Sequence, residues 1–167
     1  MATTRIIRMH INKGKTIAQC LKNRIDYAKN PEKTAGGTLV SAYGCDPETA
    51  DQEFLMMRNS YLAITGRRQK NEVIAYQIRQ SFKPGEVTPE EANKIGYELA
   101  ARLLKGQHAF IVATHVDRHH VHSHLIFSNV SLDCTHKYEE DYKSAAVVAE
   151  MSDTICKEHG LSVIEHP

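Results

Sequence analysis

Histidine is concentrated in one short part of the chain, where five of the ten histidines lie between residues 115 and 124 with apolar residues on both sides. Neutral imidazole is the commonest metal ligand in proteins. A strand sends residues i and i+2 to the same face, so His122 and His124 should point together. His115 lies on the preceding apolar run, where a neighbouring antiparallel strand would bring it alongside. The spacing therefore predicts a three-imidazole metal site with positions left open for water or a substrate.

A purely structural role is the alternative, because a single histidine on a strand is usually a satisfied structural residue. Each neutral ring needs both a donor and an acceptor satisfied. Three such rings in strand-like sequence are hard to place in a core without a purpose, which favours the metal site. His119 and His120 lie in the connection between the two strands. We interpret them as turn residues, although either could reach a substrate phosphate.

The composition indicates an ordinary globular protein. With 167 residues, 41% of them apolar and 25% charged, the chain can build one domain spanning residues 1–167. The net charge of +1 gives no overall nucleic-acid signature, so any DNA affinity must come from a local basic surface. Four cysteines without a C-x-x-C pair, and no signal peptide, predict reduced thiols and a cytoplasmic protein. No apolar run approaches the roughly 20 residues that span a bilayer, so no membrane insertion is expected.

Periodicity and turn residues predict an α+β fold. Two histidine-bearing strands at residues 109–115 and 121–130 are joined by a short polar connection, which makes them an antiparallel hairpin. We expect about five strands in a mixed or antiparallel central sheet, with helices packed on it and this hairpin at its centre. The other expected strands are 5–11, 38–45 and 71–82, with a short final strand at 161–164. The expected helices begin near residues 16, 46, 88 and 142.

The second helix carries the most detailed local prediction. Asp46 and Pro47 match the preferred residues at the N-cap and at the first helical position, so the helix should begin there. Its apolar positions should face the core, and these are Phe54, Leu55, Leu62 and Ile64.

Three segments resemble motifs of a known family. The segment His115-x-Asp117-x-x-x-x-His122-x-His124 resembles the third motif of plasmid relaxases, the mobilisation nucleases of the His-hydrophobic-His endonuclease superfamily. Residues 24–29 resemble the first motif of the relaxase/mobilisation family that includes the Agrobacterium T-DNA nicking protein, and residues 80–86, followed by 88–91, resemble the second. Ser123 departs from the pattern, since the superfamily name implies an apolar residue between the two histidines. On an outward face it would leave the ligands undisturbed and weaken only the packing behind them.

The resemblance implies an endonuclease that starts conjugative transfer. Such an enzyme nicks one DNA strand at a transfer origin, where a tyrosine attacks the scissile phosphate, stays bound to the 5′ end and frees a 3′ hydroxyl. The linkage keeps the phosphodiester energy, so the same enzyme can rejoin the strand. The implied cofactor is a divalent metal ion, Mn²⁺ or Mg²⁺, with Zn²⁺ as a further candidate. The implied partners are single-stranded or hairpin origin DNA, accessory DNA-binding proteins and a type IV coupling system in a bacterium.

The resemblance also suggests catalytic residues. Tyr27 falls in the segment that resembles the first motif, which makes it the expected nucleophile. In a sheet with helices on one face, the start of its helix could overhang the edge near the histidine hairpin. Asp117 could orient a ligand imidazole or accept the phenol proton, or it could simply belong to the hairpin turn. Some relaxase branches use a histidine near the N-terminus, which leaves His10 as a weaker alternative nucleophile.

Basic and polar side chains at several places could contact DNA phosphates. Residues 67–70 could instead form a solvated turn, and the serine at 81 could cap a turn. The candidates for DNA contact are Lys13, Lys15, Lys29, Lys33, Arg67, Arg68, Lys70, Ser81 and Arg118.

Three other functions fit parts of the pattern. A metal-dependent hydrolase without a covalent step would use the histidines and Asp117 but not Tyr27. A replication-initiator nuclease of the same superfamily would carry its tyrosine on a helix after the His-x-His strand, where Tyr138 and Tyr142 lie. A DNA-binding module with a structural metal would need a fourth protein ligand, and Cys134 is the only cysteine close to the histidines in sequence.

Overall fold

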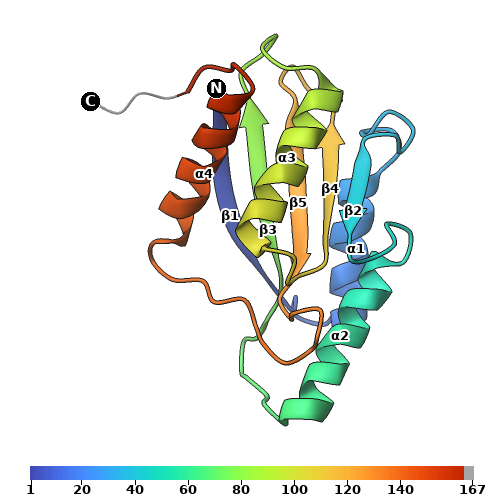
Figure 1. Cartoon of the computed structure of the whole chain (residues 1–167). Coiled ribbons are helices and arrows are strands. Elements are labelled where there is room, and N and C mark those ends of the chain that lie inside the picture. Colours follow the sequence, from blue (N-terminus) through green and yellow to red (C-terminus); the bar gives the residue numbers. More distant parts are fainter. Residues whose placement is uncertain (164–167) are drawn as a thin grey trace.

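The computed structural model describes residues 1–163 and contains five strands and four helices within them. Their order along the chain is βαβαβαββα, as Figure 1 shows. The strands are β1 (Ala2–His10), β2 (Val40–Tyr43), β3 (Val73–Phe82), β4 (Phe110–His115) and β5 (His122–Ser128). The helices are α1 (Ile17–Lys29), α2 (Ala50–Thr65), α3 (Pro89–Leu104) and α4 (Ser144–Glu158).

All five strands form one antiparallel sheet in the order β1-β3-β5-β4-β2. The central strand is β5, and its partner β4 completes the histidine-bearing hairpin. The predicted α+β class and the predicted position of the hairpin are therefore confirmed, and of the mixed and antiparallel alternatives the antiparallel sheet is the observed one.

Helices cover both faces of this sheet rather than one. Leu125 and Phe127 of β5 pack in a core cluster with residues of α3 and α4, whereas Ile126 packs with residues of α1 and α2. Successive residues of a strand point to opposite faces, so the two helix pairs lie on opposite sides. In Figure 1, α3 and α4 lie in front of the sheet and α1 lies beyond it. His122 and His124 have the same parity as Ile126 and therefore belong to the face that α1 covers.

The predicted starts of α1 and α3 agree with the structure. The Thr16 hydroxyl accepts from the amide of Gln19, and the Gln19 side-chain oxygen accepts from the Thr16 amide, so α1 starts with a capping box. The Thr88 hydroxyl accepts from the Glu91 amide, and Pro89 occupies the first turn of α3. The sequence was sufficient to predict these helix starts, because each start depends only on residues within one helical turn.

The predicted start of α2 is wrong. The helix begins at Ala50, and residues 47–49 form a turn. The Asp46 carboxylate accepts from the Glu48 amide, while the Glu53 carboxylate accepts from the amide of Asp46. The acidic groups thus hold a turn in front of the helix instead of capping it at Asp46.

The predicted core face of α2 is only partly right. Phe54 is buried, but Ile64 is 62% exposed, and Tyr61 is the buried residue of the last turns. Leu55 is partly buried against the core cluster on the α1 side of the sheet, and Leu62 is half-buried. In Figure 1, α2 extends past the end of the sheet, and Ile64 belongs to its last turn.

The remaining predictions concern the chain end and the cysteines. Leu161, Ser162 and Val163 form no strand, and Ile164, the last residue of the predicted final strand, lies outside the described residues. The four cysteines are free, as expected for reduced thiols. Within residues 1–163, no helix combines the length and the apolar character needed to cross a membrane. Cytoplasmic localisation stays a prediction.

Candidate active site

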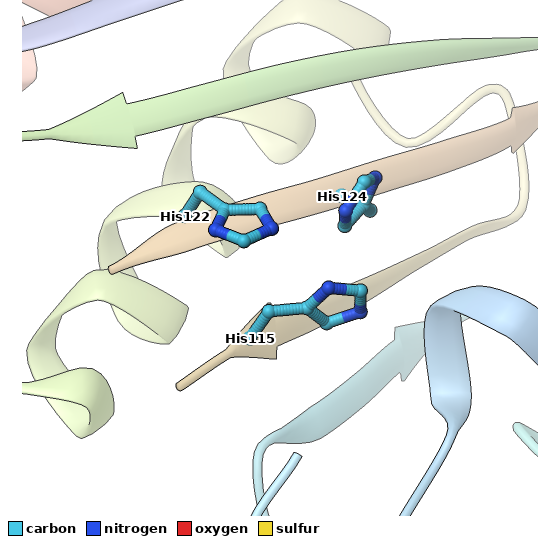
Figure 2. A group of neighbouring side chains, drawn as sticks. All are labelled: His115, His122 and His124. Carbon is cyan, nitrogen blue, oxygen red and sulfur yellow. The ribbon is translucent and has the colours of Figure 1, made fainter. Parts of the chain in front are cut away.

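Three imidazoles converge on the hairpin of β4 and β5. His115 lies directly opposite His122 across the antiparallel pair, and His124 is two residues further along the same face. Ring centroids are 5.0 Å apart for His115 and His122, 4.3 Å for His115 and His124, and 5.2 Å for His122 and His124. Figure 2 shows the three rings gathered between the two strands. One nitrogen from each ring lies within 4.8 Å of the others, so the predicted convergence is present.

Burial keeps these rings neutral. It lowers the pKa of His124 to about 3 and that of His122 to about 4, with further lowering from the neighbouring imidazoles and from Arg79. The pKa of His115 is also lowered, again mainly by burial. Neutral imidazole is the form that ligates metals, so little free energy is lost to deprotonation before an ion binds.

A backbone carbonyl orients His115. Its Nε2 lies 2.8 Å from the carbonyl oxygen of Ala28 in α1. Because a carbonyl only accepts, this nitrogen carries the proton and Nδ1 keeps its lone pair for a ligand. Metal-binding histidines commonly donate their second ring N–H to such a group.

The donor set fits one divalent ion. His122 Nδ1 and His124 Nε2 are buried without a hydrogen-bond partner, which costs free energy unless something else satisfies them. Three nitrogens within 4.8 Å can share an ion with bonds of roughly 2.1 Å after the rings close in slightly. Residues 1–163 contain no other cluster of histidine, cysteine and carboxylate side chains that could hold a metal, and no fourth protein ligand joins this one. The arrangement leaves coordination positions open.

Tyr27 lies beside the histidines, in the last turn of α1. Its ring centroid is 6.0 Å from that of His115 and 6.3 Å from that of His124, in edge-on geometry. The side chain is 54% exposed, so its ring borders the cluster and remains open to solvent. It is the end of α1 that reaches the hairpin, not its start as the sequence suggested. The reason is that α1 runs antiparallel to β1 and returns to the end of the sheet at which β4 ends.

Lys33 and Asp117 form an ion pair at the same end of the sheet, next to Tyr27. Lys33 Nζ lies 2.8 Å from Asp117 Oδ2 and 5.2 Å from the centroid of the Tyr27 ring. The ion pair lowers the pKa of the Asp117 carboxyl and raises that of the Lys33 ammonium, so both groups stay charged at neutral pH. Tyr27 therefore has a permanent cation beside its ring.

Two residues of β3 extend the site on the same face. In the antiparallel register, Ser81 lies opposite His122 and Arg79 lies opposite His124. Ser81 was a predicted site residue, whereas Arg79 was missed. Alternation along the strand places the two on one face, but only the pairing of β3 with β5 shows that this face carries the histidines.

The other predicted DNA contacts are scattered. Arg118 is exposed in the loop of the histidine hairpin, and Lys29 donates to the Pro47 carbonyl at 2.5 Å, away from the histidines. Five basic residues lie beyond the opposite end of the sheet, after β1 or before β3, about 27 Å from Ser81 along a strand of this length. They are Lys13, Lys15, Arg67, Arg68 and Lys70.

The alternative nucleophiles also lie at that opposite end. The His10 ring contacts the carbonyl of Asn71, which precedes β3. Tyr138 and Tyr142 follow the far end of β5, and the Tyr138 ring packs edge-on against Tyr76 at 5.1 Å. Of the candidates, only Tyr27 borders the three histidines.

The reverse face of the hairpin carries a polar cluster. Ser123 is fully buried, and its hydroxyl lies 2.8 Å from that of Thr114 on β4. Asn93 of α3 donates to the Thr114 hydroxyl at 3.1 Å. The expectation that Ser123 points outward is therefore wrong, because α3 covers this face and a hydrogen-bonded cluster replaces the apolar packing expected there.

The fold and the site define a protein with a trihistidine centre on the central hairpin of an antiparallel sheet and a solvent-accessible tyrosine beside it. The chain belongs to the family of MobA/VirD2-like relaxase nuclease domains: residues 27–161 match the family model described as "Relaxase: MobA/VirD2-like, nuclease domain". The matched region begins at Tyr27 and includes all three histidines.

Relatives agree with this membership. The chain is 38% identical over 125 residues to "Protein rlx" of Staphylococcus aureus, which covers 75% of this chain and 38% of that protein. It is 28% identical over 178 residues to "Group II intron-interrupted relaxase LtrB" of Lactococcus lactis, covering 87% of this chain and 32% of that protein. The chain thus spans well under two thirds of these relatives.

A solved structure shares the fold. It is titled "Molecular Basis of Vancomycin Resistance Transfer in Staphylococcus aureus", with a TM-score of 0.56 at 15% identity. The alignment covers 98% of this chain and 96% of that one, which supports the same overall fold.

Proposed function

We propose that this chain is the DNA-nicking domain of a relaxase, which cuts one strand at a transfer origin and starts conjugative transfer or mobilisation. The observation that carries the proposal is the position of Tyr27, exposed to solvent with its ring 6.0 Å from His115 and 6.3 Å from His124. The proposed nucleophile and the proposed metal ligands thus lie together at one end of the sheet, although they come from segments far apart in sequence.

The reaction is a transesterification. The Tyr27 phenol gives up its proton as its oxygen attacks the scissile phosphorus, the bond from phosphorus to the 3′ oxygen breaks, and that oxygen takes up a proton and leaves as a 3′ hydroxyl. The DNA 5′ end is then esterified to Tyr27. Attack by a 3′ hydroxyl on this phosphotyrosine reverses the reaction and rejoins the strand.

Tyr27 needs help to act as a nucleophile. A phenol with a pKa near 10 is only about 0.1% ionised at pH 7. Lys33, 5.2 Å from the ring centroid, stabilises negative charge developing on the phenol oxygen. Asp117 holds Lys33 there by their ion pair, so we assign Asp117 a positioning role. With its lowered pKa, the Asp117 carboxylate is a weak acceptor for the phenol proton.

The histidines fit a divalent metal ion held by His115, His122 and His124. When bound, such an ion polarises a non-bridging phosphate oxygen and offsets its negative charge. Mn²⁺ and Mg²⁺ are the leading candidates, and Zn²⁺ also suits three imidazoles. The Ala28 carbonyl fixes the proton of His115 on Nε2 before the ion arrives.

The proposed substrate is single-stranded or hairpin DNA of the origin, because an attacking side chain must reach an unstacked phosphate. Ser81, Lys33 and Arg118 are the proposed phosphate contacts near the site, and Lys29 is a weaker candidate because its ammonium is engaged by Pro47. The basic residues at the far end of the sheet would contact DNA only at a distance. Accessory DNA-binding proteins and a type IV coupling system are the proposed partners.

A metal-dependent hydrolase without a covalent step is the second candidate, favoured by the open trihistidine cluster itself. It would activate water and leave Tyr27 unused. The position of Tyr27 against two of the three rings favours transesterification. The replication-initiator alternative is less favoured, because Tyr138 and Tyr142 follow the opposite end of β5.

A covalent adduct tests the proposal. Purified protein is incubated with end-labelled single-stranded origin DNA and Mn²⁺ or Mg²⁺, and the products are separated in SDS. We expect a labelled protein band whose peptide carries the nucleotide on Tyr27. Tyr27→Phe, which keeps the ring, should still bind DNA but form no adduct, while Tyr142→Phe serves as the matched control. Nicking without an adduct would support the hydrolase, and an adduct on another residue would overturn the assignment of Tyr27.

A further inference from the structure

Two arginines continue the histidine site across the neighbouring strands. In the antiparallel registers, Arg79 of β3 lies opposite His124, and Arg5 of β1 lies opposite Arg79. Directly opposed residues share a face of the sheet, so both arginines lie on the histidine face. Adjacent strands are about 4.8 Å apart, which places the Arg5 backbone roughly 10 Å from that of His124. The cross-strand row therefore runs from a proposed metal ligand to two cations.

Neither arginine has an acidic partner among the described residues. No ion pair within residues 1–163 involves Arg5 or Arg79, and Arg79 Nε is buried with no hydrogen-bond partner. By contrast, the half-buried Arg58 holds the Glu72 carboxylate with Nε at 3.1 Å and Nη2 at 2.6 Å. A half-buried guanidinium is thus paired elsewhere in this fold but left unpaired beside the histidines.

This arrangement is electrostatically unfavourable without a ligand. Like charges directly opposite each other in a sheet destabilise it, and a buried N–H without a partner costs further free energy. The charge of Arg79 acts on the site itself, because Arg79 lies directly opposite His124 on the same face of the sheet. A divalent cation on those histidines would add more positive charge. An anion in contact with the arginines would offset the positive charge on this part of the sheet.

We propose that Arg79 and Arg5 form an anion site that binds a DNA phosphate, next to the phosphate at the histidines. The DNA strand would then cross β5, β3 and β1 at the level of His124. The ligand class follows from the donors, because guanidinium groups match phosphate oxygens in geometry and charge. The inference rests on the proposed nuclease function and adds a direction for the DNA strand across the sheet.

In this proposal the charge of Arg79 has opposite effects on the affinities for the metal ion and for DNA. Without DNA, Arg79 repels a divalent cation on the histidines, so metal affinity is lower than the three rings alone would give. With DNA, the phosphate screens this repulsion, and each ligand favours the other by the same factor. Removing the charge of Arg79 should therefore strengthen metal binding in free protein while weakening DNA binding. A merely structural arginine would not produce that pair of effects.

The test uses three variants at the proposed site, one control variant and two probes. Arg79→Gln and Arg5→Gln remove the charges, and Arg79→Lys keeps one. Arg8→Gln is the matched control. Arg8 lies on β1, like Arg5, but it lies on the other face of the sheet and pairs with Glu140 at 2.7 Å. Mn²⁺ binding is measured by calorimetry without DNA. Binding of a fluorescent 12-nucleotide oligothymidylate is measured by anisotropy with saturating Mn²⁺ at several salt concentrations.

For Arg79→Gln we expect severalfold tighter Mn²⁺ binding, about tenfold weaker oligothymidylate binding, and a salt slope smaller by roughly one ion. Exposed Arg5 should show the same directions with smaller changes, Arg79→Lys should recover most of the DNA affinity, and Arg8→Gln should match the wild type. Unchanged or weaker Mn²⁺ binding in Arg79→Gln, or unchanged oligothymidylate binding in both Gln variants, would overturn the anion site. The outcome is separable from that of the adduct experiment. If the wild type forms no adduct while these effects hold, the nicking function fails and the anion site stands.

Discussion

The two faces of the histidine hairpin are built from the same strands but treat their polar groups in opposite ways. On the face toward α3, the Ser123 and Thr114 hydroxyls bond each other, and Asn93 donates to the second of them. On the face toward α1, His122 Nδ1 and His124 Nε2 are buried with no partner. Both faces are buried, so burial alone does not separate them.

The difference separates structure from function. Buried polar groups normally find hydrogen-bond partners, and the exceptions need an explanation. The Ser123 and Thr114 hydroxyls need none, because they bond each other. Beside them, Gln80 of β3 donates to the Ser152 hydroxyl and leaves only its Oε1 without a partner. On the histidine face, two imidazole nitrogens lack hydrogen-bond partners, as expected for side chains that bind a ligand. Arg79 on the same face also has a buried nitrogen without a partner. If this interpretation is right, changes on the two faces should have different consequences.

The largest effect is expected from His124→Ala. It removes one of three ligands, so Mn²⁺ binding and nicking should fall below detection while the metal-free fold persists. In the wild type, Mn²⁺ at one hundred times its Kd should add about 2.7 kcal/mol to the free energy of unfolding, and the variant should gain none. Calorimetry and thermal unfolding with and without Mn²⁺ measure this. His136→Ala, an exposed histidine beyond the far end of β5, is the control. Normal Mn²⁺ binding by His124→Ala would contradict the site.

The next effect concerns pH. The pKa of His122 falls to about 4 and that of His124 to about 3 in the folded chain, below their ordinary value near 6.5 in an unfolded chain. Between these values the unfolded chain binds more protons, so stability is full above about pH 6.5 and is lost as the pH falls toward 4.

We expect a loss on the order of a few kcal/mol over that range, measured by denaturant unfolding in the presence of a chelator. His124→Ala should flatten the dependence, since it removes the histidine with the lower pKa. An equally steep loss in the variant would place the titrating groups elsewhere.

A smaller effect is expected on the other face. Ser123→Ala removes one partner of the buried hydroxyl pair and should reduce the free energy of unfolding by about 1 kcal/mol. Mn²⁺ affinity should stay within twofold of the wild type, because the serine points away from the ligands. Chemical denaturation and calorimetry on the same preparation give both values. A loss of Mn²⁺ affinity to match the loss of stability would show that the two faces act as one unit.

The smallest effect is expected at the far end of the sheet. Arg67 and Arg68 precede β3, and the part of that strand between its first residue and Ser81 spans about 27 Å. Replacing both with Gln should weaken binding of a long oligonucleotide by roughly twofold to fivefold and leave a short one unaffected. The rate of nicking of bound DNA should not change. A slower rate on short DNA would mean that these arginines reach the site.

Much of the fold and the site was readable from the sequence because it depends on local pattern. The i, i+2 spacing of His122 and His124 fixed their common face, and the short connection brought His115 opposite. The starts of α1 and α3 were predicted correctly for the same reason. Asp46 shows the limit, since its side chain can cap a helix or hold a turn, and a contact with Glu53 seven residues later decides which.

The rest depends on which strands become neighbours. Nothing near Arg79 in sequence shows that β3 pairs with β5 or that β1 pairs with β3, so the arginine row stays hidden until the sheet is assembled. The hydrogen bond from His115 to the Ala28 carbonyl likewise joins residues 87 positions apart. Ser123 was misjudged because α3, a helix distant in sequence, covers its face.

A structure of the protein crystallised with saturating Mn²⁺ tests the central claim most directly. The account predicts one ion bound by one nitrogen from each of His115, His122 and His124, with His115 bound through Nδ1 while its Nε2 still donates to Ala28, and with the remaining positions facing Tyr27. An ion-free site with the three rings turned apart, or an ion closed off by a fourth protein ligand, would contradict it.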